Sequence, residues 1–462
     1  MNIYFISLGC DKNLVDSEVM MGILTSRGHR LVTDLDAAEA VVVNSCCFIS
    51  DAKEESIDTI LELGERKQQG LLRYILVAGC LAERYRKEII EELPEVDALI
   101  GTTAFDRIGE MLDQLEAGDP ERPVSAYEDL DRLVLPENRR LIAAGEFSAN
   151  LKIAEGCNKR CTYCVIPYVR GNYRSVPMED LVADAARLAE NGVREINLVA
   201  QETTLYGVDL YGKKMLPELL RRLSDIPGIR WIRLLYCYPE EITDELIQAI
   251  RDHPKVCHYL DMPIQHASDR VLQAMGRRTT RAEITERIEK IRSEVPDIVI
   301  RTTFITGFPG ETEEDFKELY DFVDQMELDH VGVFPYSKEE GTVAEKMENQ
   351  VPDDLKEARK ESIMILQQEI SSAILADEVG RNLSVLVEGS LPDDADSEAV
   401  EEIRRAGGEG RIVYVGRTYR DAPGVDGFLF FESEEELMSG DIVPVRVLSS
   451  DVYDLYGVMQ EE

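Results

Sequence analysis

The residues most able to do chemistry in this sequence are three closely spaced cysteines, Cys157, Cys161 and Cys164. Three and then two residues separate them. A structural zinc site prefers four ligands in a closed tetrahedron, whereas a 4Fe–4S cube held by three thiolates leaves one iron open to a small molecule. The spacing therefore favours an iron–sulfur site. A zinc knuckle or a buried cysteine cluster is the alternative interpretation.

In residues 1–115, which contain a second set of cysteines, short apolar runs alternate with helical patterns. Such alternation is typical of βαβ units and an open parallel sheet. Residues 16–27 are expected to form a helix capped by Asp16 or Ser17. The expected strands are residues 2–8, 40–43, 74–77 and 96–100.

Cys10, Cys46 and Cys80 each come directly after one of these expected strands. Because the carboxyl ends of parallel strands form the ligand crevice of an open sheet, we expect the three thiols to converge on a second iron–sulfur cluster. Three unrelated small core residues would be the alternative, since free cysteine is often buried. Cys47 should point the other way along the extended chain and take no part.

The first cysteine loop belongs to a second alternating region, which runs from about residue 150 to residue 335. Six strand–helix repeats fit a (β/α)6 partial barrel, whose active site is expected at the carboxyl ends of the strands. The loop follows the first strand, where that rule places it. His266, after the fourth strand, is expected to be a structural or substrate-pocket residue. The expected strands are residues 151–154, 195–199, 231–235, 258–261, 299–306 and 330–334.

A long helix over residues 355–376 precedes a change of pattern. Five short strands in the last 85 or so residues predict a small antiparallel β-barrel of the OB-like type. Residues 377–462 hold 21 acidic and 7 basic side chains, a net charge of −14. Such barrels often bind oligonucleotides, but this charge repels phosphate and suits a basic protein. The predicted organisation is an α/β domain at 1–118, a linker at 119–147, the barrel domain at 148–376 and the small β-barrel at 377–462.

The whole chain is strongly acidic, with 51 Lys and Arg against 90 Asp and Glu and a net charge of −39. Nucleic-acid binders usually carry a basic footprint, so this balance favours a basic partner, unless the acidity serves only solubility. Nine cysteines, several of them clustered, fit metal binding in a reducing cytosol. The sequence has no run of about 18 apolar residues, so we expect a cytoplasmic protein without a membrane segment.

The cysteine loop resembles that of the radical S-adenosylmethionine (SAM) enzymes. With the three cysteines at the N-terminal strand ends and the C-terminal β-barrel, which is similar to a TRAM domain, the chain resembles the methylthiotransferase family over essentially its whole length. The segments Gly156-Cys-Asn-x-x-Cys161-Thr-Tyr-Cys164 and Ile166-Pro-Tyr-Val-Arg-Gly171 carry this resemblance. The family usually continues Arg-Ser-Arg after this loop, whereas this chain reads Arg174-Ser-Val176.

Within the family, the chain is similar to the RimO type at residues 8–18 and 335–342. The RimO type adds a methylthio group to the β-carbon of an aspartate in ribosomal protein number twelve of the small subunit. MiaB-type enzymes, the alternative, modify a tRNA adenosine and read Gln-Met-Asn after the first cysteine. This chain reads Asp11-Lys12-Asn13 there. The resemblance thus implies a sulfur-donating transferase whose partner is a basic ribosomal protein, free or in the ribosome, and tRNA only under the alternative.

The resemblance also implies the cofactors, which are SAM and two 4Fe–4S clusters. Cys157, Cys161 and Cys164 would hold the cluster that cleaves SAM to a 5′-deoxyadenosyl radical. The other three would hold an auxiliary cluster that supplies sulfur, with the methyl group coming from a second SAM. Tyr163 would contact the adenine of SAM, and flavodoxin or ferredoxin would deliver electrons. The auxiliary ligands are Cys10, Cys46 and Cys80.

Overall fold

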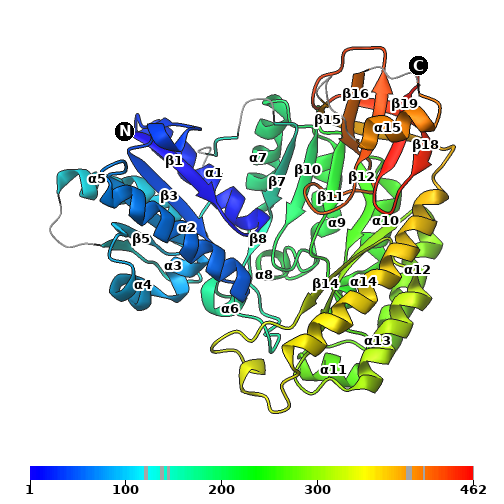
Figure 1. The fold of residues 1–462 in the computed structure, drawn as a ribbon, viewed down its shortest axis with the longest axis horizontal. Helices are drawn as coiled ribbons and strands as arrows, with labels where there is room; N and C mark the ends of the chain where they lie inside the picture. The colour runs from blue at the N-terminus through cyan, green and yellow to red at the C-terminus, as the bar shows by residue number, and fades with distance from the viewer. Residues whose placement is uncertain (119–122, 136–139, 143–145, 392–397, 409–411, 461–462) are drawn as a thin grey trace.

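The computed structural model describes residues 1–118, 123–135, 140–142, 146–391, 398–408 and 412–460. Figure 1 shows three units: an α/β unit in blue, a central barrel in green and yellow, and a small β-barrel in orange and red. The predicted domain boundaries stay predictions, and parts of the predicted linker lie outside the described residues.

The N-terminal unit is a parallel sheet with the strand order β2-β1-β3-β4-β5-β6. Helices α1 and α5 pack on one face, and α2, α3 and α4 pack on the other. Its last strand, β6, lies in the segment predicted as linker, so part of that segment completes this sheet. The bounds are β1 (Asn2–Ser7), α1 (Asp11–Ser26), β2 (Arg30–Leu31), β3 (Ala40–Ser45), α2 (Ser50–Gln68), β4 (Tyr74–Gly79), α3 (Cys80–Arg84), α4 (Arg86–Glu92), β5 (Ala98–Ile100), α5 (Ile108–Ala117) and β6 (Val124–Ala126).

Helix α1 begins five residues earlier than the sequence pattern predicts, because Cys10 rather than Asp16 or Ser17 is its N-cap. The expected cap role of Asp16 and Ser17 is therefore wrong. Both side chains lie inside the helix and are buried. Ser17 donates to Ser7 on β1 at 2.9 Å, and Asp16 faces the central barrel. Polar residues that pattern reasoning assigns to a cap thus serve tertiary contacts.

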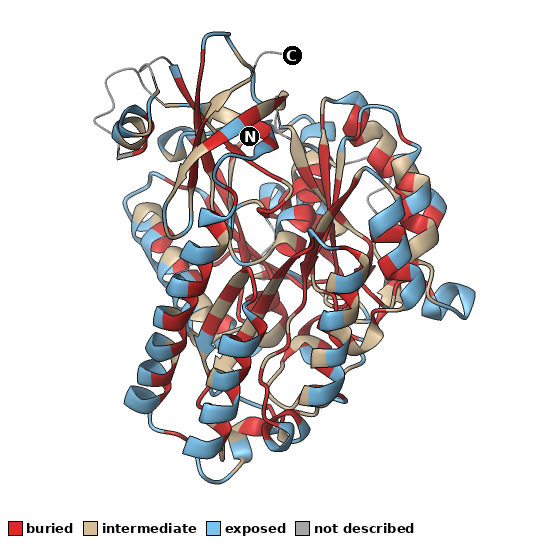
Figure 2. Ribbon diagram, turned by 90° about the vertical axis from the view of Figure 1, so that its right-hand side faces the viewer, coloured by how far each residue is buried: buried red, intermediate tan, exposed pale blue. Residues whose placement is uncertain are grey.

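The central sheet is parallel, with the order β14-β13-β12-β11-β10-β7, and helices cover its outer face (Figure 1). This confirms the predicted (β/α)6 partial barrel. The buried faces of the covering helices turn toward the sheet and their exposed faces turn outward (Figure 2). The bounds are β7 (Ser148–Lys152), α7 (Met178–Glu190), β10 (Glu195–Val199), α9 (Leu216–Ser224), β11 (Trp231–Leu234), α10 (Asp244–Asp252), β12 (Val256–Asp261), α12 (Arg281–Glu294), β13 (Val299–Thr306), α13 (Glu313–Met326), β14 (His330–Pro335) and α14 (Asp353–Ala376).

Local capping fixes where two covering helices begin. Thr280 accepts from the backbone N–H of Glu283 at the start of α12, and Glu283 in turn accepts from the Thr280 N–H. Thr312 and Asp315 do the same at the start of α13. Such reciprocal boxes satisfy N–H groups that the first turn of a helix leaves without partners. No helix in the described ranges combines the length and the apolar character that crossing a membrane requires.

The C-terminal unit is a closed five-stranded barrel in the order β15-β16-β17-β19-β18, as predicted. One pair departs from the antiparallel expectation, since β17 and β19 run parallel. A helix that the pattern did not indicate, α15 (Glu398–Arg405), packs on the barrel through Ala399 and Ile403. The strands are β15 (Asn382–Ser390), β16 (Ile412–Arg417), β17 (Leu429–Ser433), β18 (Ile442–Ser450) and β19 (Leu455–Met459).

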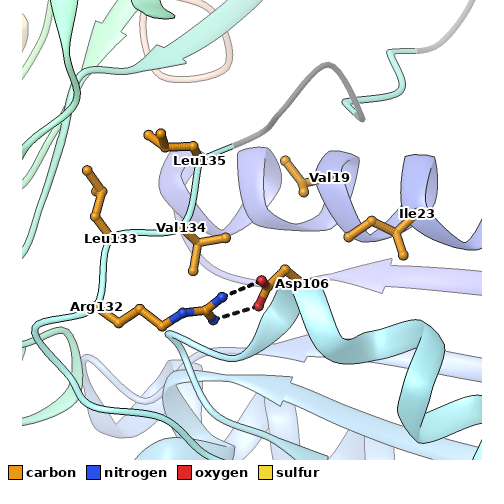
Figure 3. A pocket seen from close by; sticks show the side chains of 7 residues that line it. All are labelled: Val19, Ile23, Asp106, Arg132, Leu133, Val134 and Leu135. Carbon is orange, nitrogen blue, oxygen red and sulfur yellow. Dashed lines mark hydrogen bonds and ion pairs between the residues drawn. The ribbon is translucent and has the colours of Figure 1, made fainter.

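The segment that connects the first two units is pinned to the N-terminal unit. Arg132 donates both guanidinium branches to the Asp106 carboxylate at 2.8 and 2.6 Å. Figure 3 shows this pair below α1, beside a small cavity of about 130 Å³ that Val19, Ile23 and the connecting segment line. The connecting segment is therefore ordered here by charge-assisted, bidentate hydrogen bonds.

The C-terminal barrel docks on the central barrel through buried ions. Glu195 on β10 contacts Arg417 of β16 at 2.7 Å and Arg233 of β11 at 3.0 Å, and all three side chains are almost fully buried. Burial alone would raise the pKa of Glu195, but the two guanidinium groups hold that pKa at about 2. Because the folded-state pKa lies below the ordinary 4.5, this stabilisation is complete above that pH and is lost as pH falls toward 2.

We predict that Glu195→Gln lowers the free energy of unfolding by about 3–5 kcal/mol at pH 7, because it leaves the buried Arg233 guanidinium without its carboxylate and Arg417 with only the partly exposed Glu388. Urea titration measures the change. Glu388→Gln is the matched control, since Glu388 contacts the same Arg417 but is 25% exposed. Its loss should be about 1 kcal/mol or less. Equal losses from both variants would contradict the assigned role of Glu195.

Candidate functional site

Three thiols converge at the carboxyl edge of the N-terminal sheet. Cys10, Cys46 and Cys80 directly follow or lie just beyond β1, β3 and β4, which are neighbours in the sheet. Burial raises the pKa of the Cys80 thiol, and negative charge on Cys47, Cys46 or Cys10 raises it further. Burial also raises the pKa of Cys46, with a smaller contribution from Cys10. The three thiols therefore lie near one another at this edge of the sheet.

A second set of thiols lies on the loop after β8 (Ala154–Glu155), a short strand paired with β9 (Arg174–Ser175). Burial raises the pKa of Cys157 to about 11, with a further contribution from Cys161. The pKa of Cys164 is also raised, by burial and then by Cys161 and Cys157. These thiols form a second convergent group.

The second loop is held by backbone hydrogen bonds to distant parts of the barrel. The Cys157 N–H donates to the carbonyl of Gly171 at 3.1 Å, and the Thr162 N–H donates to that of Met275 at 2.9 Å. Thr162 in turn accepts from the N–H of Ala344 at 2.9 Å. Three separate segments thus fix a loop that has little regular structure of its own.

Both sets suit iron–sulfur clusters better than zinc. Within the part of the chain that the structure describes, the only group of three ligand atoms that all lie within 4.8 Å of one another is His29, Asp113 and Glu116, on the surface. Neither thiol triad is so compact. A tetrahedral zinc ion with Zn–S bonds of about 2.3 Å needs its sulfurs about 3.8 Å apart. Thiolates that are less closely spaced suit the ligands of a larger, iron-based cube.

A buried charge network joins the two triads. Arg170, which directly follows α6 (Ile166–Val169), contacts Asp16 of α1 at 2.9 Å and Glu155 of β8 at 3.0 Å. Lys152 pairs with the same two carboxylates. Arg170 also donates to Asn13, three residues after Cys10. Burial alone would raise the pKa of Glu155, but Arg170 and Lys152 hold it well below its usual range.

The same guanidinium acts on the N-terminal thiols. Its charge opposes the rise that burial causes in the pKa of Cys80 and of Cys46. Glu155 meanwhile lies only two residues before Cys157. Arg170 therefore fixes the positions of the two thiol sites relative to each other.

A second link involves residues 335–342, the other segment similar to the RimO type. Glu339 contacts Arg84 of α3 at 3.1 Å. Ser337 donates to Glu339 at 2.7 Å and accepts from the backbone N–H of Ser50 at 3.3 Å. This segment therefore packs the end of the barrel against the helices that follow Cys46 and Cys80.

Polar atoms without partners lie beside the second triad. Within the described residues, Glu202 Oε2 and the Nε and Nη1 atoms of Arg277 are buried and have no hydrogen-bond partner. Burial raises the pKa of Glu202 to about 7. Among the smaller contributions, the charge of Cys161 raises the pKa of Arg277, and the charge of Glu202 raises the pKa of Cys157. A carboxylate and a guanidinium near the thiols complement the ammonium and carboxylate of an amino acid such as the methionine part of SAM.

Sequence reasoning did not single out Glu202 or Arg277. Glu202 follows β10 in a polar stretch, which was the available signal. Arg277 lies in the loop after α11 (Asp269–Ala274) and carries no local signal, because only the fold brings it to the thiols.

The other singled-out residues are placed as follows. Tyr163 packs among Val271, Met275 and Phe308, and burial, followed by the nearby Cys161, raises its pKa. Val176, where the family usually has arginine, is buried in the main core. His266 accepts from the backbone N–H of Ser268 and lies 3.4 Å from Glu311. The remaining cysteines, Cys47, Cys237 and Cys257, are buried, and Cys47 is among the groups that raise the pKa of Cys80, so its expected lack of a role stays a prediction.

Comparisons with known families match three segments. Residues 151–323 match the radical SAM superfamily, and residues 379–459 match the TRAM domain. Residues 2–101 match the uncharacterized protein family UPF0004. Residues 2–101 contain the triad of Cys10, Cys46 and Cys80, and residues 151–323 contain the triad of Cys157, Cys161 and Cys164. Residues 379–459 form the C-terminal barrel.

Several relatives are similar to this chain over their full length. The chain is 52% identical over 460 residues to ribosomal protein uS12 methylthiotransferase RimO of Lachnoclostridium phytofermentans, covering 100% of each chain. It is 48% identical over 462 residues to the protein of the same name from Acetivibrio thermocellus, covering 99% and 98%. The Pelotomaculum thermopropionicum protein of that name is 48% identical over 452 residues, covering 98% of both.

Among solved structures, the chain resembles the radical S-adenosylmethionine methyltransferase TsrM of Kitasatospora setae. The structure with tryptophan and a SAM analogue has a TM-score of 0.52 at 14% identity and covers 86% of this chain and 79% of that one. The structure with cobalamin and a 4Fe–4S cluster has a TM-score of 0.51 at 15% identity, with coverages of 72% and 74%. At these identities the likeness shows the fold alone.

Two glycines allow a separate test of each triad. Gly9 and Gly156 have φ of +91° and +79° and directly precede Cys10 and Cys157. A Cβ on Gly156 would lie 2.1 Å from the carbonyl oxygen of Asn172, and one on Gly9 would lie 2.9 Å from the Cys46 sulfur. Neither position has room for a side chain.

We predict that Gly9→Ala and Gly156→Ala each reduce the iron of the anaerobically reconstituted protein from about eight to about four per chain, because each displaces one triad. Only Gly156→Ala should abolish cleavage of SAM. Gly70→Ala is the matched control, since Gly70 has φ +78° but open space around it. Iron and sulfide analysis measures the outcome. Full iron in Gly9→Ala would exclude a cluster at the N-terminal triad.

Proposed function

This chain belongs to the RimO family of radical SAM methylthiotransferases, and from that premise we propose that it adds a methylthio group to the β-carbon of an aspartate in ribosomal protein uS12. The cofactors of the family are SAM and 4Fe–4S clusters. The observation that supports the proposal most directly is the presence of two convergent thiol triads joined by the Arg170 network. One cluster would suffice for radical formation alone, so the second triad favours a reaction that also delivers sulfur.

In this proposal the two triads have different roles. Cys157, Cys161 and Cys164 hold the cluster that binds SAM, and Cys10, Cys46 and Cys80 hold the auxiliary cluster. When bound, these groups supply the electron, the hydrogen-abstracting radical and the sulfur. The protein fixes the thiols through the backbone contacts of the second loop and through the adjacent strands of the N-terminal sheet.

The side chains beside the second triad orient SAM. We assign the SAM carboxylate to Arg277 and its ammonium to Glu202, because the two groups have the complementary charges and each keeps buried atoms without a hydrogen-bond partner among the described residues. Tyr163 lies near Cys161 and Arg277, which supports its predicted contact with the adenine. Burial of these groups excludes water, which would otherwise compete for their hydrogen bonds.

The charge distribution supports a basic protein substrate. Ribosomal proteins bind RNA phosphates and are basic, whereas this chain has a net charge of −39. Complementary charge increases the rate of encounter, while tRNA would be repelled by the acidic C-terminal barrel. Action on tRNA, as in MiaB-type enzymes, is therefore not favoured. We further propose a cytoplasmic location, where uS12 is made and assembled, and flavodoxin or ferredoxin as the electron donor.

We predict that reduced, reconstituted protein transfers one SCH3 group in place of one hydrogen to uS12 and none to tRNA, as mass spectrometry would show. Cys10→Ala should still cleave SAM to 5′-deoxyadenosine but should transfer no SCH3, because only the auxiliary cluster would be lost. Cys157→Ala should do neither.

Cys257→Ala is the control, because Cys257 is a buried cysteine that packs against Val199 and Tyr259, away from both triads. Its transfer should stay within about twofold of the unmodified protein, since a small cavity affects stability more than chemistry. Modification of tRNA instead of uS12 would overturn the proposed substrate. Methylthio transfer by Cys10→Ala would overturn the role given to the N-terminal triad.

A further inference from the structure

Lys12 is a buried lysine that lies between the two units, and none of the described carboxylates forms an ion pair with it. It is the second residue of α1, two positions after Cys10, and is 4% exposed. Its ammonium lies 3.1 Å from the centroid of the Tyr236 ring, which follows β11 at the carboxyl edge of the central barrel. The side chain therefore crosses from the N-terminal unit to the edge at which barrel enzymes place their substrates.

The other buried cations at this interface are all paired with carboxylates. Within the described residues, by contrast, no carboxylate oxygen lies within 4.0 Å of the Lys12 ammonium. The paired cations are Arg170 and Lys152 with Asp16 and Glu155, Arg140 with Glu18, Lys159 with Glu241, and Arg301 with Asp261.

The acidic groups that act on Lys12 are Cys10, Asp11 and Asp261, and each has another role, that of Cys10 being the proposed auxiliary cluster. Asp261 contacts Arg301 at 3.0 Å and accepts from the backbone N–H of Tyr236 at 3.0 Å. Asp11 accepts from the Tyr236 hydroxyl at 3.3 Å. An unpaired charge in this environment is costly, so a site that retains one is suited to a ligand of opposite charge.

The backbone of Tyr236 is strained in a way that holds the ring beneath the lysine. Its φ of +61° lies in the left-handed region, which is uncommon for a bulky residue. Strain of this kind persists where surrounding contacts enforce it and is found mainly at functional sites. A ring face attracts the ammonium without occupying its hydrogen-bonding capacity, which leaves its N–H groups free for an acceptor.

From these contacts we propose that Lys12 binds the side-chain carboxylate of the substrate aspartate. This inference rests on the proposed function and names the residue that recognises its target. The carboxylate lies next to the β-carbon that receives the methylthio group. Because the protein is strongly acidic, an aspartate needs a local cation to enter a buried site. Lys12, two residues from Cys10, would hold that carbon near the N-terminal triad.

The test compares two forms of full-length uS12, one with the natural target aspartate and one with asparagine in its place. Binding to the anaerobically reconstituted enzyme is measured by fluorescence anisotropy. The unmodified enzyme should bind the asparagine form about 10- to 100-fold more weakly, as expected for loss of a hydrogen-bonded charge. Lys12→Gln should bind the aspartate form weakly to the same extent and should show no further loss with the asparagine form.

Two further variants separate recognition from structure. Lys12→Arg retains the charge and should keep most of the preference for aspartate. Lys53→Gln is the matched control, because Lys53 lies 5.8 Å above the Tyr85 ring on the same unit and should leave the preference unchanged. Iron content and the unfolding midpoint verify that each variant is folded.

Equal binding of both uS12 forms by the unmodified enzyme would overturn the inference, and this outcome requires no variant to fold. Weakening of both forms to the same extent by Lys12→Gln would also overturn it, because that is the result of a purely structural contact with Tyr236. Failure of the proposed function gives a different result, namely no transfer of SCH3 to natural uS12 by the unmodified enzyme.

Discussion

The geometry of the proposed reaction depends on one buried guanidinium, that of Arg170. The two thiol triads belong to separate sheets, so their separation is set by whatever holds α1 against the barrel. Arg170 and Lys152 meet Asp16 from α1 and Glu155 from β8 in a compact, neutral group of two cations and two anions. Removing one member of such a group leaves a charge uncompensated in the interior, which typically costs about 3–5 kcal/mol. The network therefore specifies one arrangement of the two units.

The position of Arg170 also has an electrostatic consequence. In the proposed function, three thiolates and a reduced cluster would accumulate negative charge here, and the nearby guanidinium would offset part of it. Outer groups of this kind tune the potential and stability of a metal centre as well as its orientation. Lys12 is close to the same thiols but has no carboxylate to neutralise it in the described structure. Arg170 is thus committed to structure, whereas Lys12 is available to a substrate.

The features that sequence reasoning predicted are those with local signals. Cys10, Cys46 and Cys80 were placed together because each follows an apolar run, and the ends of adjacent parallel strands meet at one edge. The six-stranded barrel followed from the alternation of strands and helices. The pairing of Arg170 with Asp16 joins residues 154 positions apart and has no local pattern. For the same reason Asp16 was assigned to a helix cap, and the parallel pairing of β17 with β19 was missed.

The incomplete central barrel explains why the C-terminal unit docks on it. Six strands leave the inner face open, and that face carries polar and aromatic side chains such as Arg233, Tyr259 and Arg301. The C-terminal barrel covers it with a loop in which Tyr419 and Ala422 pack against Tyr259 and its neighbours. Asp426 of that loop accepts from the Tyr259 hydroxyl at 2.6 Å and lies 3.4 Å from Arg301.

Arg301 in turn contacts Asp261, which holds the backbone of Tyr236 beneath Lys12. A continuous set of polar contacts therefore runs from the C-terminal barrel through the inner face to the edge beside Cys10. Buried polar networks of this kind are rigid only when their members are satisfied. Docking of the acidic barrel, by completing the contacts of Arg301, thus fixes the ring on which the substrate-facing lysine rests. On this reasoning the C-terminal unit shapes the active site without contributing a group to the chemistry.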